Sequence, residues 1–491
     1  MTPSHPRPAR GAGRRALVAL LALGLVAAAC GDSSSDGDAD RTTRGGRPAE
    51  AAVEPVERWQ ARGRWLVDQT GRTVIPRGLQ VVHAEDGSFL LPPDMIGPED
   101  ADLMRSWGFN AIRLTWAWRG IEPEPGRYDP QYGKDLAEMI SMFQSRGIAV
   151  HLMASADQGW GYTNDFAESD QVQGPFPLLD PVMLKNYETF YTGEDADGNE
   201  DWRTDAFVKA WGLIAEAVAD DPPRLGYDLY NEPQPAQSSC LGDEGCPEGD
   251  AWLYAYEDRL ADAIRAHDTT SVIWYEPQVM FNTANPTHIG PIDESRLPAG
   301  FAFHSYCNSS PITSATPETL AACIDEVMDN GAAAAEDAGG IPYVMNEMGG
   351  SGQSQELITT IADSVDAHAA GWFYWGYKDH DTIIFSDNRD NSTADPDWVR
   401  TISRPFPQAT AGTPGPYAFD PATRTFTYRF EPDAAVEADT EIFTAPVHYP
   451  DGYEVEVTGA TVVSEPDADV LLLRLGDDPP ATVTVTLTPR G

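Results

Sequence analysis

The chain has 491 residues, which is too long for one ordinary domain and suits a large domain of roughly 250–350 residues together with a smaller module. Hydrophobic residues make up 41% of it and aromatic residues 10%, which excludes a globally disordered chain. Its 33 basic and 77 acidic residues give a net charge of −44. A field of that sign repels phosphate backbones, so nucleic acid is excluded as a partner.

The first 30 residues have the features of a bacterial lipoprotein signal peptide. Arginines between Arg7 and Arg15 precede an apolar run, 16–29, that is too short to span a bilayer comfortably. Small residues end this run just before Cys30, an arrangement typical of a lipobox, whose Cys sulfur becomes acylated. We therefore expect an exported protein that is anchored to a membrane through Cys30 and displayed on the cell surface. The alternative is an ordinary cleaved signal and a secreted protein.

A tether and then a barrel are predicted next. Residues 31–56 are rich in Gly, Asp, Ser, Arg and Ala and lack apolar periodicity, so we expect them to be disordered. In residues 57–404, strand-like apolar runs alternate with helical patterns. The runs lie at 74–82, 111–116, 148–154, 225–230, 272–275, 301–305, 343–346 and 372–375, and the helical patterns include 133–146, 204–219, 252–267 and 356–369. This alternation predicts an α/β fold, a (β/α)8 TIM barrel. A doubly wound sheet would also alternate, but no Gly-rich phosphate-binding turn follows an early strand.

Residues 405–491 follow a different pattern. Short alternating segments lie at 425–430, 440–444, 453–457, 470–475 and 481–487, and Pro, Gly and Asp turns separate them. This spacing predicts a small antiparallel β-sandwich.

Four cysteines remain after the signal peptide, and an even number in an exported chain favours disulfide bonds. Their spacing suggests the pairs Cys240–Cys246 and Cys307–Cys323, although two other pairings are possible. No CxxC spacing or neighbouring His cluster is present, so no metal site is predicted.

Two glutamates follow strand-like runs in the same way. Glu232 ends the segment that begins at 225, next to Asn231, and Glu347 ends the segment that begins at 341. Catalytic groups of TIM barrels lie at the C-terminal ends of the strands. Two carboxyl groups there suit glycoside hydrolysis, in which one donates a proton and the other attacks the sugar or activates water. In a retaining pair, the negative charge of Glu347 would raise the pKa of Glu232 and keep it protonated.

Asn231-Glu232-Pro233, with Glu347 after a later strand, resembles glycoside hydrolase family 5. The resemblance covers nearly everything after the tether and is sharpest at 107–114, 120–129, 226–233, 275–277 and 371–378. The segment 120–129, and Arg-Pro-Phe-Pro at 404–407 before a β-sandwich, are similar to the endoglycoceramidase branch, which releases whole glycans from ceramide. The resemblance implies a retaining endo-β-glycosidase acting on a glycolipid, with Glu232 as acid/base, Glu347 as nucleophile and no cofactor.

The resemblance also implies supporting roles. Arg113 would hydrogen-bond the nucleophile and keep it ionised, and Asn231 would contact the sugar 2-hydroxyl. His304 and Tyr306 would position the two carboxylates. Further substrate contacts would come from three residues after other strands, namely Asp157, Trp375 and Lys378.

The chain departs from the branch at two places that line the same sugar. Met153-Ala154-Ser155-Ala156-Asp157 stands where a His would precede the Asp by two positions, and His83-Ala84-Glu85 stands where a Lys would follow the first strand. Because the two glutamates are retained, these departures indicate an altered sugar specificity, with glucose and galactose both left open as the recognised sugar, and not an inactive enzyme.

Two questions stay open from the sequence. The aromatic-rich segment 158–191 either forms an apolar slot for a lipid or packs into a small core of its own. The substrate is a glycolipid in the leading hypothesis, and an oligosaccharide or polysaccharide if the protein is instead an endo-β-glucanase or another β-glycanase. A non-catalytic glycan-binding surface protein is the third possibility.

Overall fold

The computed structural model describes residues 55–490 except 83–88, 93–94, 156–160, 164–179, 196, 238–239, 241–244, 308–316, 351–352 and 379–382. The predicted signal peptide with Cys30 and nearly all of the tether lie outside the described residues. So do the predicted substrate residue Asp157, the segment His83-Ala84-Glu85 and the middle of the aromatic-rich segment.

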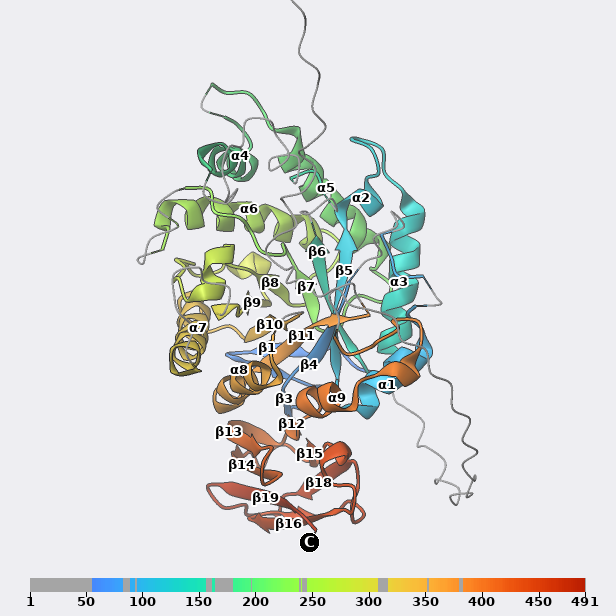
Figure 1. Ribbon diagram of the computed structural model, residues 1–491. Helices are drawn as coiled ribbons and strands as arrows, with labels where there is room; N and C mark the ends of the chain where they lie inside the picture. Colours follow the sequence, from blue (N-terminus) through green and yellow to red (C-terminus); the bar gives the residue numbers. More distant parts are fainter. Residues whose placement is uncertain are drawn as a thin grey trace, which may run out of the picture.

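A closed barrel of parallel strands forms the larger part of the described molecule (Figure 1). Its strands follow one another around the barrel in chain order: β4 (Arg77–Val81), β5 (Ala111–Ala117), β6 (Ala149–Ser155), β7 (Gly226–Asp228), β8 (Ile273–Tyr275), β9 (Ala299–His304), β10 (Tyr343–Gly349) and β11 (Gly371–Tyr377). Every residue of β5 and β6 is buried, because side chains on one face fill the barrel and those on the other contact helices. This explains why the strands appear in the sequence as continuous apolar runs, and it confirms the predicted barrel.

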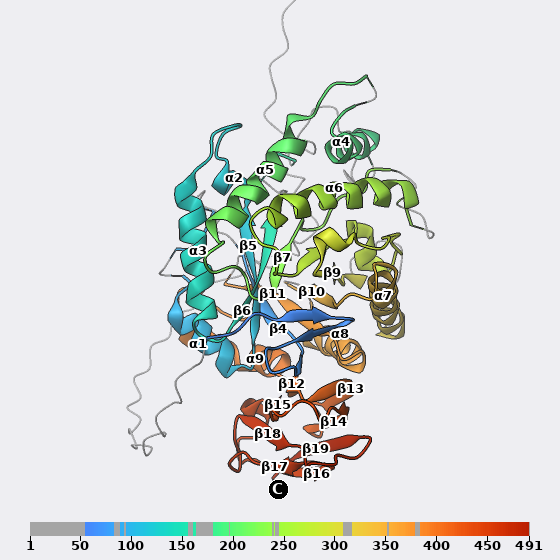
Figure 2. The ribbon, with the colours of Figure 1, turned by 180° about the vertical axis from the view of Figure 1, so that it is seen from behind.

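Helices surround the barrel, as Figures 1 and 2 show. They are α1 (Pro98–Ser106), α2 (Trp118–Ile121), α3 (Pro130–Gln144), α4 (Pro181–Thr192), α5 (Trp202–Ala217), α6 (Pro247–Arg265), α7 (Pro317–Asp337), α8 (Gln355–Ala367) and α9 (Pro396–Ile402). In α3, Leu136, Ile140 and Phe143 recur at helical spacing and are buried. The Asp129 carboxylate accepts a hydrogen bond from the Gln131 backbone N–H and so caps this helix.

Two antiparallel sheets lie against one end of the barrel. The smaller contains β13 (Gly412–Asp420), β14 (Thr425–Pro432), β19 (Val483–Pro489) and β16 (Tyr453–Thr458). The larger has the order β1 (Gln60–Arg62), β2 (Trp65–Val67), β3 (Thr73–Val74), β12 (Phe406–Thr410), β15 (Thr440–Phe443), β18 (Val470–Arg474) and β17 (Thr461–Val462). Alternate residues of β14, namely Phe426, Tyr428 and Phe430, are buried in the core that the sheets share, as expected for a sandwich.

The larger sheet joins the two ends of the described chain. Val74 on β3 pairs with Ala409 on β12, so the first three strands belong to this sheet and not to the barrel wall. The sequence analysis assigned one run, 74–82, to the first barrel strand. The structure divides it at Pro76, which has no backbone N–H to donate and separates β3 from β4.

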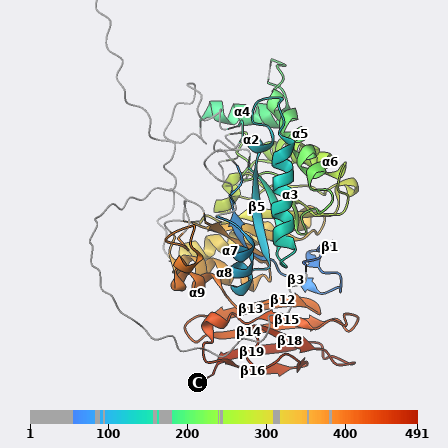
Figure 3. The ribbon, with the colours of Figure 1, turned by 90° about the vertical axis from the view of Figure 1, so that its right-hand side faces the viewer.

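A buried arginine at the start of the first barrel strand bonds both the barrel and the C-terminal sheets. Arg77, at the start of β4, bonds the Asp366 carboxylate on α8 and the Tyr417 hydroxyl on β13, and its guanidinium lies 4.4 Å from the Trp372 ring centroid. Figure 3 shows the sheets stacked below the barrel strands, at the end opposite α4. The sheets therefore do not cover the other end of the barrel, where the strands have their C-termini.

The described residues contain both disulfides that the cysteine spacing suggested, Cys240–Cys246 and Cys307–Cys323. Among the same residues, no helix combines the length and the apolar character that crossing a membrane requires.

Candidate active site

Glu232 and Glu347 meet at the C-terminal end of the barrel. Glu232 lies four residues after the end of β7, and Glu347 lies within β10. An oxygen of each carboxyl group and a nitrogen of His304 all lie within 4.8 Å of one another. A retaining pair of carboxyl groups is about 5–5.5 Å apart and an inverting pair about 6.5–9.5 Å apart. The observed approach fits the retaining geometry.

Glu347 is surrounded by groups that favour its ionised form. Its Oε2 accepts a 2.7 Å hydrogen bond from Arg113 Nη1, and its Oε1 accepts a 2.8 Å bond from the Tyr306 hydroxyl. Burial and the neighbouring Glu232 raise the pKa of Glu347, and Arg113 and Tyr306 offset only part of that rise. A carboxylate held by a cation and a hydroxyl is a suitable nucleophile.

Arg113 is fully buried and binds several acceptors at once. Besides Glu347, its Nε donates to Asp228 Oδ2 at 2.8 Å, and its Nη2 donates to Glu276 Oε2 at 3.2 Å. Burial alone would raise the pKa of Asp228, but the Arg113 and His151 contacts hold it below its ordinary value. These bonds to Asp228 and Glu276 orient the guanidinium toward Glu347.

Glu232 has different neighbours. Its Oε1 contacts Asn282 Nδ2 at 2.7 Å and His304 Nδ1 at 2.9 Å, and its backbone N–H donates to Glu276 Oε1 at 2.9 Å. Burial raises the pKa of Glu232, while Asn282 and the more distant Arg113 lower it. A carboxyl that keeps its proton above the ordinary range suits a general acid.

The cause of this shift differs from the one expected. The sequence analysis attributed the raised pKa of Glu232 to the charge of Glu347, whereas burial is the leading cause in the structure.

Burial also lowers the pKa of His304 to about 4, so its ring is neutral at neutral pH. The backbone of Glu232 has φ = +46°, a conformation that costs free energy in a residue with a side chain and is often found at functional sites.

The donor atoms of Glu232, His304 and Glu347 are also close enough to share a metal ion. However, Arg113 places a positive charge directly on Glu347, and the Asn282 amide donates to Glu232. A cation would have to compete with both, so the arrangement suits proton transfer and nucleophilic attack better.

Comparison with known proteins identifies the family of this site. The model of the family "Cellulase (glycosyl hydrolase family 5)" matches residues 67–381, and that of the "Glycoside hydrolase family 5 C-terminal domain" matches residues 404–487. The chain belongs to glycoside hydrolase family 5. It is therefore a retaining glycoside hydrolase, as the sequence analysis predicted.

Relatives within the family cover most of this chain. Endoglycoceramidase I of Rhodococcus hoagii is 32% identical over 88% of this chain and 88% of its own length. Two structures of endo-glycoceramidase II from Rhodococcus sp. are each 25% identical to the present chain. The match to its lactosyl-enzyme intermediate has a TM-score of 0.68 and covers 87% of the present chain and 100% of that structure. The match to its ganglioside GM3 complex has a TM-score of 0.67 and covers 88% of the present chain and 100% of that structure.

The structure of this family 5 enzyme brings together most of the site residues expected from the sequence. Arg113, His304 and Tyr306 make the predicted contacts with the two carboxyl groups. Asn231 lies beside Glu232, and its Oδ1 is buried without a hydrogen-bond partner among the described residues. Trp375 ends up partly exposed on β11. The substrate contacts predicted for Asn231 and Trp375 remain predictions.

Lys378 is placed differently. Its Nζ donates to Asp100 Oδ1 at 2.6 Å and to the Met95 carbonyl at 2.9 Å, and its side chain is 3% exposed. These contacts hold α1 against the end of β11, which is a structural role. The substrate contact predicted for Lys378 remains a prediction.

Two residues of the site were not assigned by sequence reasoning. Glu276 comes directly after β8, so the strand-end pattern that indicated Glu232 was also available to find it. Asn282 lies in a short 3-10 helix, η4 (Val279–Thr283), and no local pattern distinguishes it from other loop amides.

The described part of the aromatic-rich segment belongs to the core. The Tyr162 ring packs edge-on against Trp118 with centroids 5.1 Å apart, and Phe190 does the same against Tyr256 at 4.9 Å. Tyr187 and Tyr191 are also buried. For these residues, packing is favoured over an open slot for a lipid.

Proposed function

We propose that this enzyme releases the intact glycan from a ceramide-type glycolipid, with Glu347 as the nucleophile and Glu232 as the acid/base. The observation that carries the substrate class is the 32% identity to endoglycoceramidase I, which extends over 88% of both chains. The ganglioside complex of the related endo-glycoceramidase II supports the same class.

The contacts of the two glutamates support these roles. Glu347, held by Arg113 and Tyr306, attacks the anomeric carbon while the Glu232 proton passes to the leaving oxygen. The bond to the lipid alcohol breaks, and a glycosyl ester forms on Glu347. Glu232, now a carboxylate, takes a proton from water, whose oxygen attacks the same carbon and releases Glu347 with the anomeric configuration retained.

Product analysis tests the substrate class. Purified enzyme is incubated with gluco- and galactosylceramides, gangliosides and β-glucans, and the products are identified by mass spectrometry, with Glu347→Gln as the inactive control. We expect intact oligosaccharide and free ceramide from glycolipids. Products from glucans alone would favour an endo-β-glucanase, and binding without turnover would favour a glycan-binding protein. Comparison of glucosyl- and galactosylceramide tests the predicted change of sugar.

We further propose that the protein is exported and anchored through an acylated Cys30. The basic and apolar signal followed by Ala-Ala-Cys supports this location. Cys30→Ala expressed in a bacterial host tests it, since the wild type should fractionate with membranes and the variant should not. Release of the wild type into the medium would favour the secreted alternative.

A further inference from the structure

Two donors converge on one oxygen of Glu232. Asn282 Nδ2 lies 2.7 Å from Oε1 and His304 Nδ1 lies 2.9 Å from the same oxygen. We propose that Asn282 is a positioning residue that keeps Oε1 as a hydrogen-bond acceptor, so that the catalytic proton of Glu232 is carried by Oε2. This inference rests on the proposed role of Glu232 as acid/base.

His304 alone does not determine which oxygen carries the proton. Its neutral ring has one N–H, and its two nitrogens face different carboxyl groups. Nδ1 lies 2.9 Å from Glu232 Oε1 and 3.5 Å from Glu347 Oε1, whereas Nε2 lies 3.2 Å from Glu276 Oε1 without the geometry of a hydrogen bond. The proton can reside on either nitrogen, so Nδ1 can donate to Glu232 or accept from it. The Asn282 amide nitrogen can only donate, and a proton on Oε1 would point at it.

The segment that carries Asn282 is tied to both halves of the site. The Val279 backbone N–H donates to the Pro233 carbonyl at 2.8 Å, directly after Glu232. The Asn282 carbonyl accepts a 2.8 Å bond from the Tyr306 N–H, and the Tyr306 hydroxyl binds Glu347. Asn282 is 6% exposed. Asn282 thus contacts Glu232 through its side chain. Through its backbone carbonyl it contacts Tyr306, whose hydroxyl binds Glu347.

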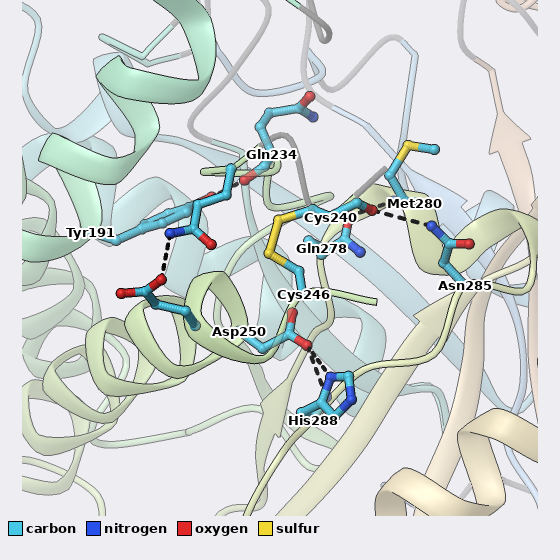
Figure 4. The surroundings of a disulfide bond; sticks show 11 residues. Tyr191, Gln234, Cys240, Cys246, Asp250, Gln278, Met280, Asn285 and His288 are labelled. Carbon is cyan, nitrogen blue, oxygen red and sulfur yellow. Dashed lines mark hydrogen bonds and ion pairs between the residues drawn. A yellow bond between two sulfur atoms is a disulfide. The ribbon is translucent and has the colours of Figure 1, made fainter. Parts of the chain in front are cut away.

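The same segment makes a contact away from the carboxyl groups. Asn285 Nδ2 donates to the Cys240 carbonyl at 3.2 Å, beside the Cys240–Cys246 disulfide (Figure 4). This bond links the segment that follows η4 to the segment after Glu232 and does not involve either catalytic carboxyl group. Asn285→Ala therefore reports the effect of loosening the segment alone.

Several charged or titratable groups surround Glu232 in the described structure. They are Arg113 from β5, Glu276 after β8, His304 and Tyr306 at the end of β9, and Glu347 from β10. A substitution of Asn282 changes none of these side chains. Loss of the Asn282 donor removes a group that stabilises the Glu232 carboxylate, so the pKa of Glu232 should rise further.

The test compares Asn282→Asp, Asn282→Ala and Asn285→Ala with the wild type. Asn282→Asp keeps the size of the side chain but removes the donor, which guards against a loss caused by folding alone. Rates are measured on aryl β-glycosides with leaving groups of different acidity and on the glycosylceramide, across pH, and thermal unfolding confirms that each variant is folded.

We expect both Asn282 variants to move the alkaline limb of the kcat/KM profile to higher pH. They should lose about 10-fold to 100-fold on the poor leaving group and less than about 5-fold on the most acidic phenol, which needs little acid assistance. Asn285→Ala should keep the wild-type limb and the wild-type dependence on leaving group.

Equal losses on all leaving groups with an unmoved alkaline limb, or the same pattern in Asn285→Ala, would overturn the proposal. Hydrolysis of aryl glycosides but not of the glycosylceramide by the wild type would reject only the proposed substrate. A wild type inactive on every β-glycoside would overturn both the catalytic roles and this inference.

Discussion

Arg113 is the side chain on which the charge balance of the site depends. It is fully buried and donates to Glu347, Asp228 and Glu276, which lie on or directly after three different strands. Its planar guanidinium reaches these acceptors at fixed angles, which the single ammonium of a lysine cannot do. Substitution therefore leaves buried carboxyl groups without a partner.

We predict that Arg113→Lys lowers the free energy of unfolding by about 1–3 kcal/mol, because the ammonium cannot bond all three carboxyl groups and leaves a buried acceptor unsatisfied. The catalytic rate should fall as well, since the fixed guanidinium bond to Glu347 is lost. Urea unfolding followed by tryptophan fluorescence measures the first effect. Arg127→Lys, at an exposed arginine, is the control. Equal stability of the two variants would contradict the interpretation of Arg113 as the central cation.

Glu257, on α6, makes the stability depend on pH. It is fully buried, and burial raises its pKa well above the ordinary value. In the unfolded chain a glutamate loses its proton near pH 4.3. Above that pH the protein must bind a proton to fold, so the contribution of Glu257 to stability falls as pH rises towards the raised pKa of the folded state.

We predict that Glu257→Gln removes this dependence. Relative to the wild type, the variant should gain about 1.4 kcal/mol of unfolding free energy per pH unit over that range. Denaturant unfolding between pH 4 and pH 8 measures the slope, with Glu248→Gln, exposed on the same helix, as the control. Parallel stability curves for the wild type and Glu257→Gln would reject the prediction.

At the scale of elements, the loops after the strands carry the site, and disulfides hold two of them. Cys246 stands at the N-terminus of α6 and binds Cys240 in the segment after Glu232. Cys307 follows Tyr306 directly and binds Cys323 on α7. Each bond therefore restrains a segment next to one partner of the catalytic pair.

We predict that the two bonds differ in their contributions. The pairs are 6 and 16 residues apart, so loop-closure entropy gives about 2 kcal/mol for Cys240–Cys246 and about 3 kcal/mol for Cys307–Cys323. Double Cys→Ser variants at each pair should show this order in thermal unfolding without reductant. The Cys307 pair should also lower the turnover rate more, because Tyr306 binds the nucleophile. The reverse order of stability would show that strain or local packing outweighs the loop length.

At the scale of the whole molecule, the barrel and the sheets share elements. Strands β1 to β3 come before the barrel in the sequence and yet extend a sheet built from the C-terminal part. Arg77 and Arg404 both bind Asp366 at the same junction. Removal of the C-terminal part would leave β3 without β12 and Arg77 without Tyr417.

We therefore predict that a chain ending at Arg404 does not fold on its own. Calorimetry of the full chain should show a single transition, and the shortened chain should lack a cooperative transition and be inactive on aryl glycosides. A soluble, active fragment would show that the sheets are a dispensable module.

The sequence by itself determined the elements and the two glutamates. Apolar periodicity is local, so the barrel strands, the main helices and most sandwich strands could be predicted within a few residues. The strand-end positions of Glu232 and Glu347 follow from the same local pattern, and the family resemblance added Arg113, His304 and Tyr306.

Only the tertiary structure decided the rest. The pairing of β3 with β12 joins segments more than 300 residues apart, and no local pattern encodes such a contact. Asn282 reaches Glu232 because a short 3-10 helix folds over the barrel mouth, and Lys378 is held by Asp100 because α1 packs beside β11. Burial is also a property of the assembled barrel. It is the main cause of the raised pKa of Glu232, whereas the sequence suggested only the neighbouring charge.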